Sequence, residues 1–450
     1  MNIEGDYLNF SKNRTLIIIV ILLTIIISAF VIITKTKNPN VHNINQNDIK
    51  KYSLDITGAT DTSASFQKMV DSYPSGSTIE LPAGKYSFHN TVKLKDGIKL
   101  NATSNVIIIG TGNNTLFSVG NVNSFQGIEF QNCSTALSVD QKKGLRVSAC
   151  KFFNKINFAA INFSNASNCS VTNSSFYDIF KYGILIDKDS SNITIDKNNF
   201  NNAKVFGGYA KEQISGHVYC LNGTKIKVTN NVLKNSGGQG VIFAYNSTTG
   251  KGTTNSVASN NQCIGNGQEG ATIYGGNQKV TEGNSLIGNT CKNNRFNQIE
   301  IWQSNNNIVK NNIVEESKAG IGNLGAICLF DTFQTTCTGN KVLSAQNNGI
   351  DITSGSYKCT ISNNNIQNTN GNKANNAKEK GNGILLDSNG KAQPQYITIK
   401  DNKISSSIGT INKSGIYSTS NTDQHNKINN NKITGYKTGV HQYAKMTIGK

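Results

Sequence analysis

The amino-acid sequence predicts an all-β fold, in which the chain winds as a parallel β-helix solenoid. Only 16% of the 450 residues are charged, four are proline, and asparagine is prominent, which is unlike a helical protein. Two short apolar patterns also alternate from about residue 125 to the end, and successive copies lie 23 to 38 residues apart. A repeat of this length favours a solenoid or a propeller.

The first pattern is a glycine followed by alternating apolar residues, as in YGILID (182–187) and NGILLD (382–387). The second is an apolar residue, two or three polar ones rich in asparagine, and another apolar residue, as in VTNNVL and ISNNNI. Each unit offers two or three strands, whereas a propeller blade needs four. The leucine consensus of a leucine-rich repeat is missing as well. We therefore expect about ten to twelve coils with inward ladders of apolar side chains.

Residues 15–34 form the first predicted element, since these twenty residues carry no charge and can span a bilayer. A cleaved signal peptide is the alternative, but the run ends directly at Lys35 and Lys37, which favours an uncleaved anchor. We predict a cytoplasmic tail at 1–14, a transmembrane signal anchor at 15–34 and a linker at 35–51. The protein is then a single-pass protein of the cell membrane, with the β-helix domain outside the cytoplasm.

Residues 61–72 predict a short amphipathic helix with Phe66, Met69 and Val70 on one side. It would cover the open N-terminal end of the solenoid, where backbone and core would otherwise be exposed. We assign the β-helix domain to residues 52–450. The asparagines at its turns tolerate left-handed backbone and can bond one another from coil to coil, which is a structural role.

The start of this domain carries D-T-x-A-x-x-Q at Asp61 to Gln67 and then I-E-L-P-A-G-K-Y at Ile79 to Tyr86. With the asparagine-rich coils, it resembles the pectate-lyase-like superfamily of right-handed parallel β-helices. That superfamily includes polysaccharide lyases, polygalacturonase-type hydrolases, uronan epimerases and phage tailspikes. The N-T-D, D-D and G-H-G series of polygalacturonases and the D-P-H-D of alginate epimerases are missing, so their residue roles do not transfer.

The net charge of +18 at pH 7 would attract polyanions, although a lysine-rich solvated surface explains it equally well. We expect a polysaccharide partner, with an acidic polymer among the alternatives, and no nucleic acid. The nine cysteines form no C-x-x-C pair and are expected to be small buried residues, without a metal site. No cofactor is expected, and calcium would enter only if the protein is a lyase.

We aligned the coils on the glycine of the first pattern. The residues two and four positions after this glycine should face outward. This places Glu300 and Asp351 two coils apart, roughly 10 Å at the backbone, with Asp331 at the edge of the coil between them. Inverting glycosidases separate their two carboxyl groups by about 6.5–9.5 Å. We therefore propose Glu300, Asp331 and Asp351 as catalytic acids and bases; solvated acids or a calcium site are the alternatives.

Other outward positions carry aromatic rings on which sugars could stack. Three adjacent predicted coils carry Tyr274, Trp302 and Phe330 at these outward positions, and an earlier coil carries Tyr219. Arg295 could grip a uronate carboxylate as a bidentate partner. The resemblance to β-helix lyases, which commonly use Arg or Lys as the base, makes Arg295, Lys211 and His217 the alternative catalytic set.

Together these observations predict an extracytoplasmic, membrane-anchored enzyme that degrades a polysaccharide. Hydrolysis by the carboxyl groups is the favoured reaction. The alternatives are β-elimination on a uronate polymer and a non-catalytic carbohydrate-binding or adhesion module.

Overall fold

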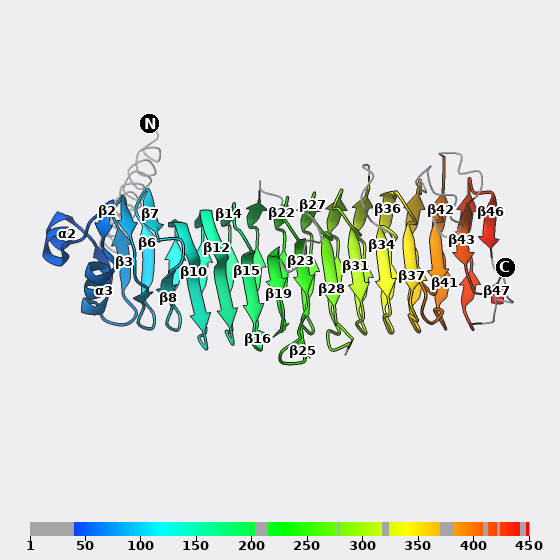
Figure 1. Cartoon of the computed structure of the whole chain (residues 1–450), viewed down its shortest axis with the longest axis horizontal. Coiled ribbons are helices and arrows are strands. Elements are labelled where there is room, and N and C mark those ends of the chain that lie inside the picture. The colour runs from blue at the N-terminus through cyan, green and yellow to red at the C-terminus, as the bar shows by residue number, and fades with distance from the viewer. Residues whose placement is uncertain are drawn as a thin grey trace, which may run out of the picture.

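The computed structural model describes residues 40–202, 215–277, 279–316, 324–369, 381–407, 413–420, 424–441 and 447–449. Its coils stack side by side along one long axis and form a rod, which runs from the helices at the N-terminal end to β47 at the other (Figure 1). Successive coils pair in parallel, as predicted.

The first sheet contains 16 strands, which is more than the ten to twelve coils predicted. The shortfall arises because the repeat pattern is weak before residue 125, where strands already form. These strands are β1 (Val41–Asn43), β3 (Thr78–Leu81), β6 (Lys99–Ala102), β9 (Ser124–Gln126), β11 (Arg146–Ser148), β13 (Ser170–Thr172), β17 (Thr194–Asp196), β21 (Lys227–Thr229), β26 (Val257–Ser259), β29 (Ser285–Ile287), β32 (Ile308–Lys310), β35 (Thr336–Thr338), β38 (Thr360–Ser362), β41 (Thr398–Lys400), β44 (Lys427–Asn429) and β47 (Thr447–Gly449).

The second sheet follows the asparagine turn of each coil. Its strands are β2 (Thr57–Asp61), β4 (Gly84–Ser87), β7 (Val106–Ile109), β10 (Glu129–Asp140), β12 (Lys151–Ser164), β14 (Ser175–Tyr177), β18 (Asn199–Asn201), β22 (Val232–Lys234), β27 (Gln262–Ile264), β30 (Thr290–Lys292), β33 (Ile313–Glu315), β36 (Lys341–Ser344), β39 (Asn365–Gln367), β42 (Lys403–Ser405) and β45 (Lys432–Thr434).

The third sheet carries the outward positions at which the sequence predicts the site residues. The long strands β10 and β12 continue from the second sheet through the corner into the third sheet. Its other strands are β5 (Val92–Lys93), β8 (Thr115–Ser118), β15 (Tyr182–Asp187), β19 (Gly216–Cys220), β23 (Gln239–Phe243), β28 (Ala271–Tyr274), β31 (Ile299–Trp302), β34 (Ile327–Phe330), β37 (Ile350–Thr353), β40 (Ile384–Asp387), β43 (Ser414–Ser418) and β46 (Thr438–His441). Four short strands complete the fold: β16 (Ser190–Ser191) with β20 (Gly223–Thr224), and β24 (Tyr245–Asn246) with β25 (Lys251–Gly252).

The core consists of side chains that repeat from coil to coil. Phe130, Phe152, Phe176 and Phe200 form a continuous stack with ring centroids 4.2 to 4.9 Å apart. The nine cysteines are all buried and unpaired, as predicted, and Cys220 and Cys337 point into the core.

The asparagine pairs of the second pattern explain the turn between the first and second sheets. In Asn311–Asn312, the first residue takes a left-handed φ of 56° and the second is buried. The Nδ2 of Asn312 donates to Oδ1 of Asn340 at 2.9 Å, one coil farther along. The same bond repeats through an asparagine ladder made of Asn198, Asn231, Asn261, Asn289, Asn312, Asn340, Asn364, Asn402 and Asn431.

The glycine of the first pattern stands at the corner between the second and third sheets. A Cβ on Gly349 would lie 2.5 Å from Ile366 Cγ2 and 2.6 Å from the carbonyl oxygen of Gly383 in the next coil. Real Cβ atoms do not approach so closely, so this corner requires glycine. The glycine therefore marks where each strand of the third sheet begins.

The N-terminal end is covered by α3 (Ser63–Ser72), whose Phe66, Met69 and Val70 are buried, as predicted. The strand β1 and all but the last residue of a second helix, α2 (Gln46–Tyr52), lie in the segment 35–51 that the sequence assigns to a linker. The first sheet extends into this segment, because β1 pairs with β3. In the described part of the chain, no helix is long and apolar enough to cross a membrane; the predicted anchor at 15–34 lies outside it.

Candidate functional site

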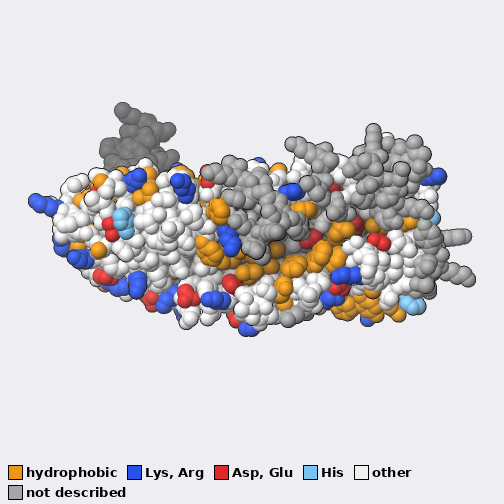
Figure 2. Space-filling model, viewed as in Figure 1, with side chains coloured by type: hydrophobic (Ala, Val, Ile, Leu, Met, Phe, Trp, Pro, Cys, Tyr) orange, Lys and Arg blue, Asp and Glu red, His pale blue; other side chains and the backbone are white. Residues whose placement is uncertain are grey.

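The outward face of the third sheet brings together most of the predicted site residues. Strand pairing aligns Glu300 with Cys328 and Cys328 with Asp351, so Glu300 and Asp351 lie two coils apart, as predicted. The side chains that alternate with them, such as Ile301 and Ile352, point into the core. Figure 2 shows this face with a band of hydrophobic side chains along its middle and acidic side chains beside it.

Glu300 and Asp351 are far more buried than solvated surface acids, with exposed fractions of 8% and 1%. Burial raises the pKa of Asp351 to about 8, while hydrogen bonds from the Asn348 side chain and the Gly325 N–H lower it. Burial, and then the neighbouring charge of Glu269, raises the pKa of Glu300 well above its ordinary value. Asn297 Nδ2 donates to Glu300 Oε1 at 2.8 Å and fixes its carboxyl group. Asp351 is therefore held as a protonated acid near neutral pH, and burial disfavours the charged form of Glu300 in the same way.

Three further carboxyl groups adjoin this pair, and sequence reasoning does not select them. Glu269 lies directly before the corner glycine of its coil, and burial raises its pKa to about 7. Glu316 is buried at the corner of a later coil, where its Oε1 accepts from Gln298 at 3.2 Å. Asp387 is half-buried on the coil after Asp351 and accepts from the Thr419 hydroxyl at 2.7 Å. A Glu directly before the corner glycine is the signal that could have identified Glu269.

The predicted aromatic ladder forms over only part of its length. Trp302 and Phe330 stack with centroids 3.6 Å apart and planes within 5°. Tyr274 shares their register but packs against Tyr245 instead, at 5.7 Å. Tyr219 is buried in an apolar cluster on earlier coils of the same face, together with Tyr182. The Trp302–Phe330 pair thus lies on the coils of Glu300 and Cys328, next to the carboxyl groups.

Asp331 is not aimed at the same space as Glu300 and Asp351. It is the first residue after β34, with a left-handed φ of 48°, so the chain turns away from the sheet there. Its Oδ1 lies 2.7 Å from Nζ of Lys279, and Gln303 approaches Oδ2 at 3.4 Å. These contacts give Asp331 a structural role in joining neighbouring turns.

The predicted basic set is not assembled on this face among the described residues. The His217 ring occupies the corner position against Phe200, inside the coil, and its Nε2 donates to the Lys234 carbonyl at 2.6 Å. Burial lowers the pKa of His217 to about 4. Arg295 lies at the corner before β31 with its guanidinium over the Phe296 ring, and Lys211 lies outside the described residues.

Several buried polar atoms on this face have no hydrogen-bond partner within the described chain. They are Oε1 of Gln239 and the hydroxyls of Thr272 and Thr353. Buried polar groups are nearly always paired, so such a cluster indicates a site that a ligand or water completes. No group of three or more His, Cys, Asp or Glu in the described residues is arranged to hold a metal ion.

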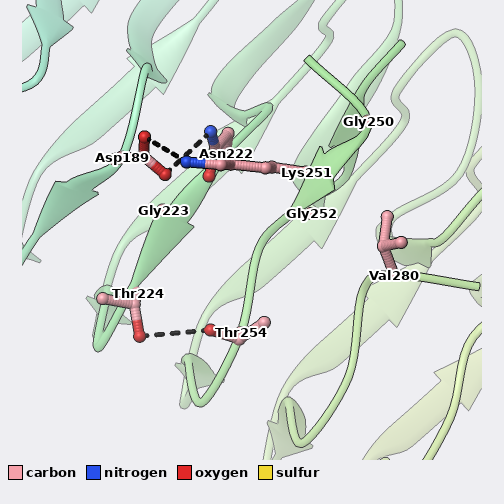
Figure 3. A pocket seen from close by; sticks show the side chains of 9 residues that line it. All are labelled: Asp189, Asn222, Gly223, Thr224, Gly250, Lys251, Gly252, Thr254 and Val280. Atoms are coloured by element: carbon pink, nitrogen blue, oxygen red, sulfur yellow. Dashed lines mark hydrogen bonds and ion pairs between the residues drawn. The ribbon is translucent and has the colours of Figure 1, made fainter.

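A separate pocket of about 350 Å³ lies at the turns beyond β19 and β23 (Figure 3). Its wall includes Gly223, Thr224 and Thr254, and the ion pair of Lys251 with Asp189 crosses it at 2.8 Å. Both partners are more than half exposed and already neutralise each other. We therefore place the candidate site on the third sheet rather than here.

Comparison with known proteins agrees with this architecture. Gene product 12 of bacteriophage phi29 superimposes with a TM-score of 0.68 at 12% identity, over 88% of this chain and 56% of that one. A PL6 alginate lyase superimposes with a TM-score of 0.56 at 14% identity, over 92% of this chain and 88% of the lyase chain. The A-module of the mannuronan C-5 epimerase AlgE4 of Azotobacter vinelandii superimposes with a TM-score of 0.51 at 15% identity, over 89% of this chain and 99% of the module. These likenesses show the shared fold. Among curated proteins, none matches this sequence.

The sequence also matches a protein family described as the right handed beta helix region, over residues 88–257 and 250–433. The matched segments cover most of the described coils, including all strands that carry the candidate site. This chain is therefore a member of the right-handed β-helix family.

Proposed function

We propose that this protein is a glycoside hydrolase that cleaves a polysaccharide lying along the outward face of the third sheet. The observation that carries the proposal is the buried Asp351 carboxyl, whose pKa is raised by burial to about 8, close to the Trp302–Phe330 stack. Solved β-helix proteins include an alginate lyase and a mannuronan epimerase, so this fold accommodates polysaccharides in other proteins.

Asp351 is the general acid in this proposal, because a pKa of about 8 keeps it protonated until it meets the leaving oxygen. Asp387 is the base. It is half-buried, accepts hydrogen bonds from Thr419 and from the Asn389 N–H, and lies one coil and two residues from Asp351. That offset separates their Cα atoms by roughly 8 Å. An inverting reaction needs carboxyl groups about 6.5–9.5 Å apart, which leaves room for the attacking water.

Glu300 and Trp302 would hold the sugar, since the Glu300 carboxyl can hydrogen-bond a hydroxyl and a half-buried indole can stack on a ring. Asp331 has no place in this mechanism, because Lys279 already neutralises it. An elimination is less well supported, because His217 is buried inside a corner and Arg295 lies over Phe296. We retain the membrane anchor at residues 15–34 as part of the proposal, which directs the domain to a polymer outside the cell.

The test incubates the purified full-length protein with neutral, amino-sugar and uronate polysaccharides and follows reducing ends and the ultraviolet absorbance of unsaturated uronates. Reducing ends without absorbance support hydrolysis, whereas both signals rising together would mean elimination. Asp351→Asn should lower the rate about 100- to 10,000-fold. Asp401→Asn is the matched control, because Asp401 is exposed on a turn with a left-handed φ that asparagine tolerates. Binding without cleavage of any polymer would replace the enzyme by an adhesion module.

A further inference from the structure

A row of aromatic side chains lies at the corner between the third and first sheets, away from the candidate site. It consists of Phe333, Tyr357, Tyr396 and His425, and we name it the corner ladder. Its members precede β35, β38, β41 and β44, which are successive strands of the first sheet. Backbone bridges align Phe333 with Tyr357, and Tyr357 with Gln395, the residue before Tyr396. With coils about 4.8 Å apart, the ladder extends roughly 14 Å along the rod.

The rings of the corner ladder are not sealed off from solvent. Phe333 and Tyr357 are half-buried and parallel within 8°, with centroids 5.7 Å apart. Tyr396 is 44% exposed and turns its ring 65° from that of Tyr357, and His425 is exposed as well. Figure 2 shows hydrophobic side chains gathered at the lower edge of the molecule, apart from the band along the middle. Such exposed groups of apolar side chains mark interaction surfaces.

The backbone makes Tyr396 an unusual residue for its position. Its φ is 55°, in the left-handed region that bulky side chains rarely adopt. The position lies two residues before a strand of the first sheet. Five earlier coils have asparagine or glycine there, also with positive φ, and these residues are Asn168, Asn192, Asn255, Gly283 and Asn306. Backbone strain of this kind persists mainly at functional sites.

We propose that the corner ladder is a second carbohydrate-binding surface, on which a polysaccharide chain lies along the rod. The inference goes beyond the proposed function, because binding here requires no cleavage on the third sheet. The ladder repeats from coil to coil, so a ligand that contacts several coils in the same way must itself repeat. A polymer of sugars has this property.

The side chains beside the ladder suit the hydroxyl groups of sugars. The strands β35, β38 and β41 begin with Thr336, Thr360 and Thr398, which are half-buried and aligned in register. The second residue of each strand is buried, so these threonines face outward. A threonine hydroxyl donates and accepts hydrogen bonds, as does a sugar hydroxyl. The exposed Lys358, with Nζ 5.2 Å from the Tyr357 ring centroid, adds a further donor. Apolar rings and polar groups thus adjoin, as in sites for ligands with apolar faces and polar edges.

The test measures binding to amylose, xylan, chitosan and polygalacturonate by affinity electrophoresis. It uses the full-length protein with Asp351→Asn, in which cleavage is suppressed and the polymers stay intact. We expect at least one polymer to bind, and a further Tyr396→Asn exchange to weaken that binding at least 10-fold. The thermal unfolding midpoint should not fall, because asparagine tolerates the left-handed backbone better than tyrosine. Val122→Asn is the matched control and should leave binding unchanged, since Val122 has the same position on an early coil, with φ 57° and 50% exposure.

A second variant, His425→Asn, removes a neighbouring ring at the same left-handed position and should also weaken binding. Unchanged affinity of both variants, or binding of no polymer, overturns the inference. A lower midpoint with unchanged affinity would give the ladder a structural role instead. A dimer that dissociates in Tyr396→Asn, with unchanged polymer affinity, would assign the surface to a second copy of this chain. Cleavage by the wild type supports the proposed function whichever of these results is found.

Discussion

A carboxyl group that is 1% exposed is expensive to ionise, and Asp351 is such a group. The fold tolerates it because the group stays protonated at the pH values where its exposed counterparts are charged. Cys328, one coil before it, shows the same environment, since burial and then Glu300 and Asp351 raise the pKa of its thiol. At the scale of the residue, this part of the third sheet is thus a dry and acidic surface.

Stability should therefore depend on pH through Asp351. Its pKa is about 8 in the folded protein and near 3.8 when unfolded, so the folded state holds the proton over the range between these values. Stability is then fully present below about pH 4 and falls as the pH rises to about 8. The Asp351→Asn variant has no carboxyl group to ionise at this position. Its thermal unfolding midpoint should therefore rise progressively relative to that of the wild type between pH 4 and pH 8. A midpoint difference that stays constant across this range would contradict the raised pKa of Asp351. For the control Asp401→Asn, we expect no such change of the midpoint difference with pH.

Sequence reasoning at this scale succeeds where strict alternation holds and fails where the chain bends. Glu300 and Asp351 sit within straight strands, so counting from the corner glycine predicts their side correctly. His217 occupies the corner position itself, where the bend turns its ring inward against Phe200. Asp331 follows the strand end, where a positive φ breaks the alternation. Counting residues cannot detect either change of direction.

At the scale of the element, the turns between the first and second sheets are held by side chains rather than by backbone alone. Asn312 Nδ2 also donates to the Leu286 carbonyl at 2.9 Å, and its Oδ1 accepts from the Asn289 backbone at 2.8 Å. One side chain thus satisfies buried groups in the coils on both sides. The sequence predicts these turns well, because asparagine is suited to both the left-handed position and the ladder position.

Asn312→Ala should destabilise the protein by about 3 kcal/mol, because it leaves the buried Leu286 carbonyl and Asn289 N–H without partners. The adjacent Asn311→Gly is the matched control and should cost little, since Asn311 is exposed and its φ of 56° suits glycine. Denaturant titration measures both. A loss below about 1 kcal/mol for Asn312→Ala would argue against the ladder as a stabilising element.

Elements with weak patterns are the ones that the sequence misses. The helix α2 buries none of its side chains, so its sequence QNDIKKY lacks the apolar stripe by which a helix is recognised. The strand β1 has three residues, which is too short for an alternation to be visible. Both elements depend on contacts with distant residues, β1 by pairing with β3, and a local pattern cannot contain such information.

At the scale of the whole molecule, each coil contacts mainly its two neighbours, and the hairpin of β24 and β25 is an exception. Asn246 Nδ2 donates to both carboxyl oxygens of Asp187, at 2.9 and 3.1 Å, and Lys251 pairs with Asp189. Asp187 lies at the end of β15, two coils before the hairpin. The hairpin therefore couples coils that the stacking alone leaves independent.

Removing this coupling with Asn246→Ala and Lys251→Ala together should increase amide hydrogen exchange locally. We expect faster exchange in β15, β19 and β23, with unchanged exchange in β37 and β40, because the energy of a solenoid is local. Lys358→Ala is the control, since the side chain of Lys358 lies over the ring of its neighbour Tyr357 on a distant coil. Faster exchange along the entire rod would show instead that the solenoid opens as one unit.

The asparagine ladder also orders the amide dipoles of the molecule. From Asn198 to Asn402, one Nδ2 hydrogen of each ladder side chain donates to Oδ1 of the next ladder asparagine toward the C-terminal end, so the side-chain dipoles point in one direction. Hydrogen bonds aligned in a chain polarise one another. An amide in the middle of the row is polarised from both sides and one at either end from a single side. The same substitution should therefore cost more at Asn312 than at Asn198 or Asn431.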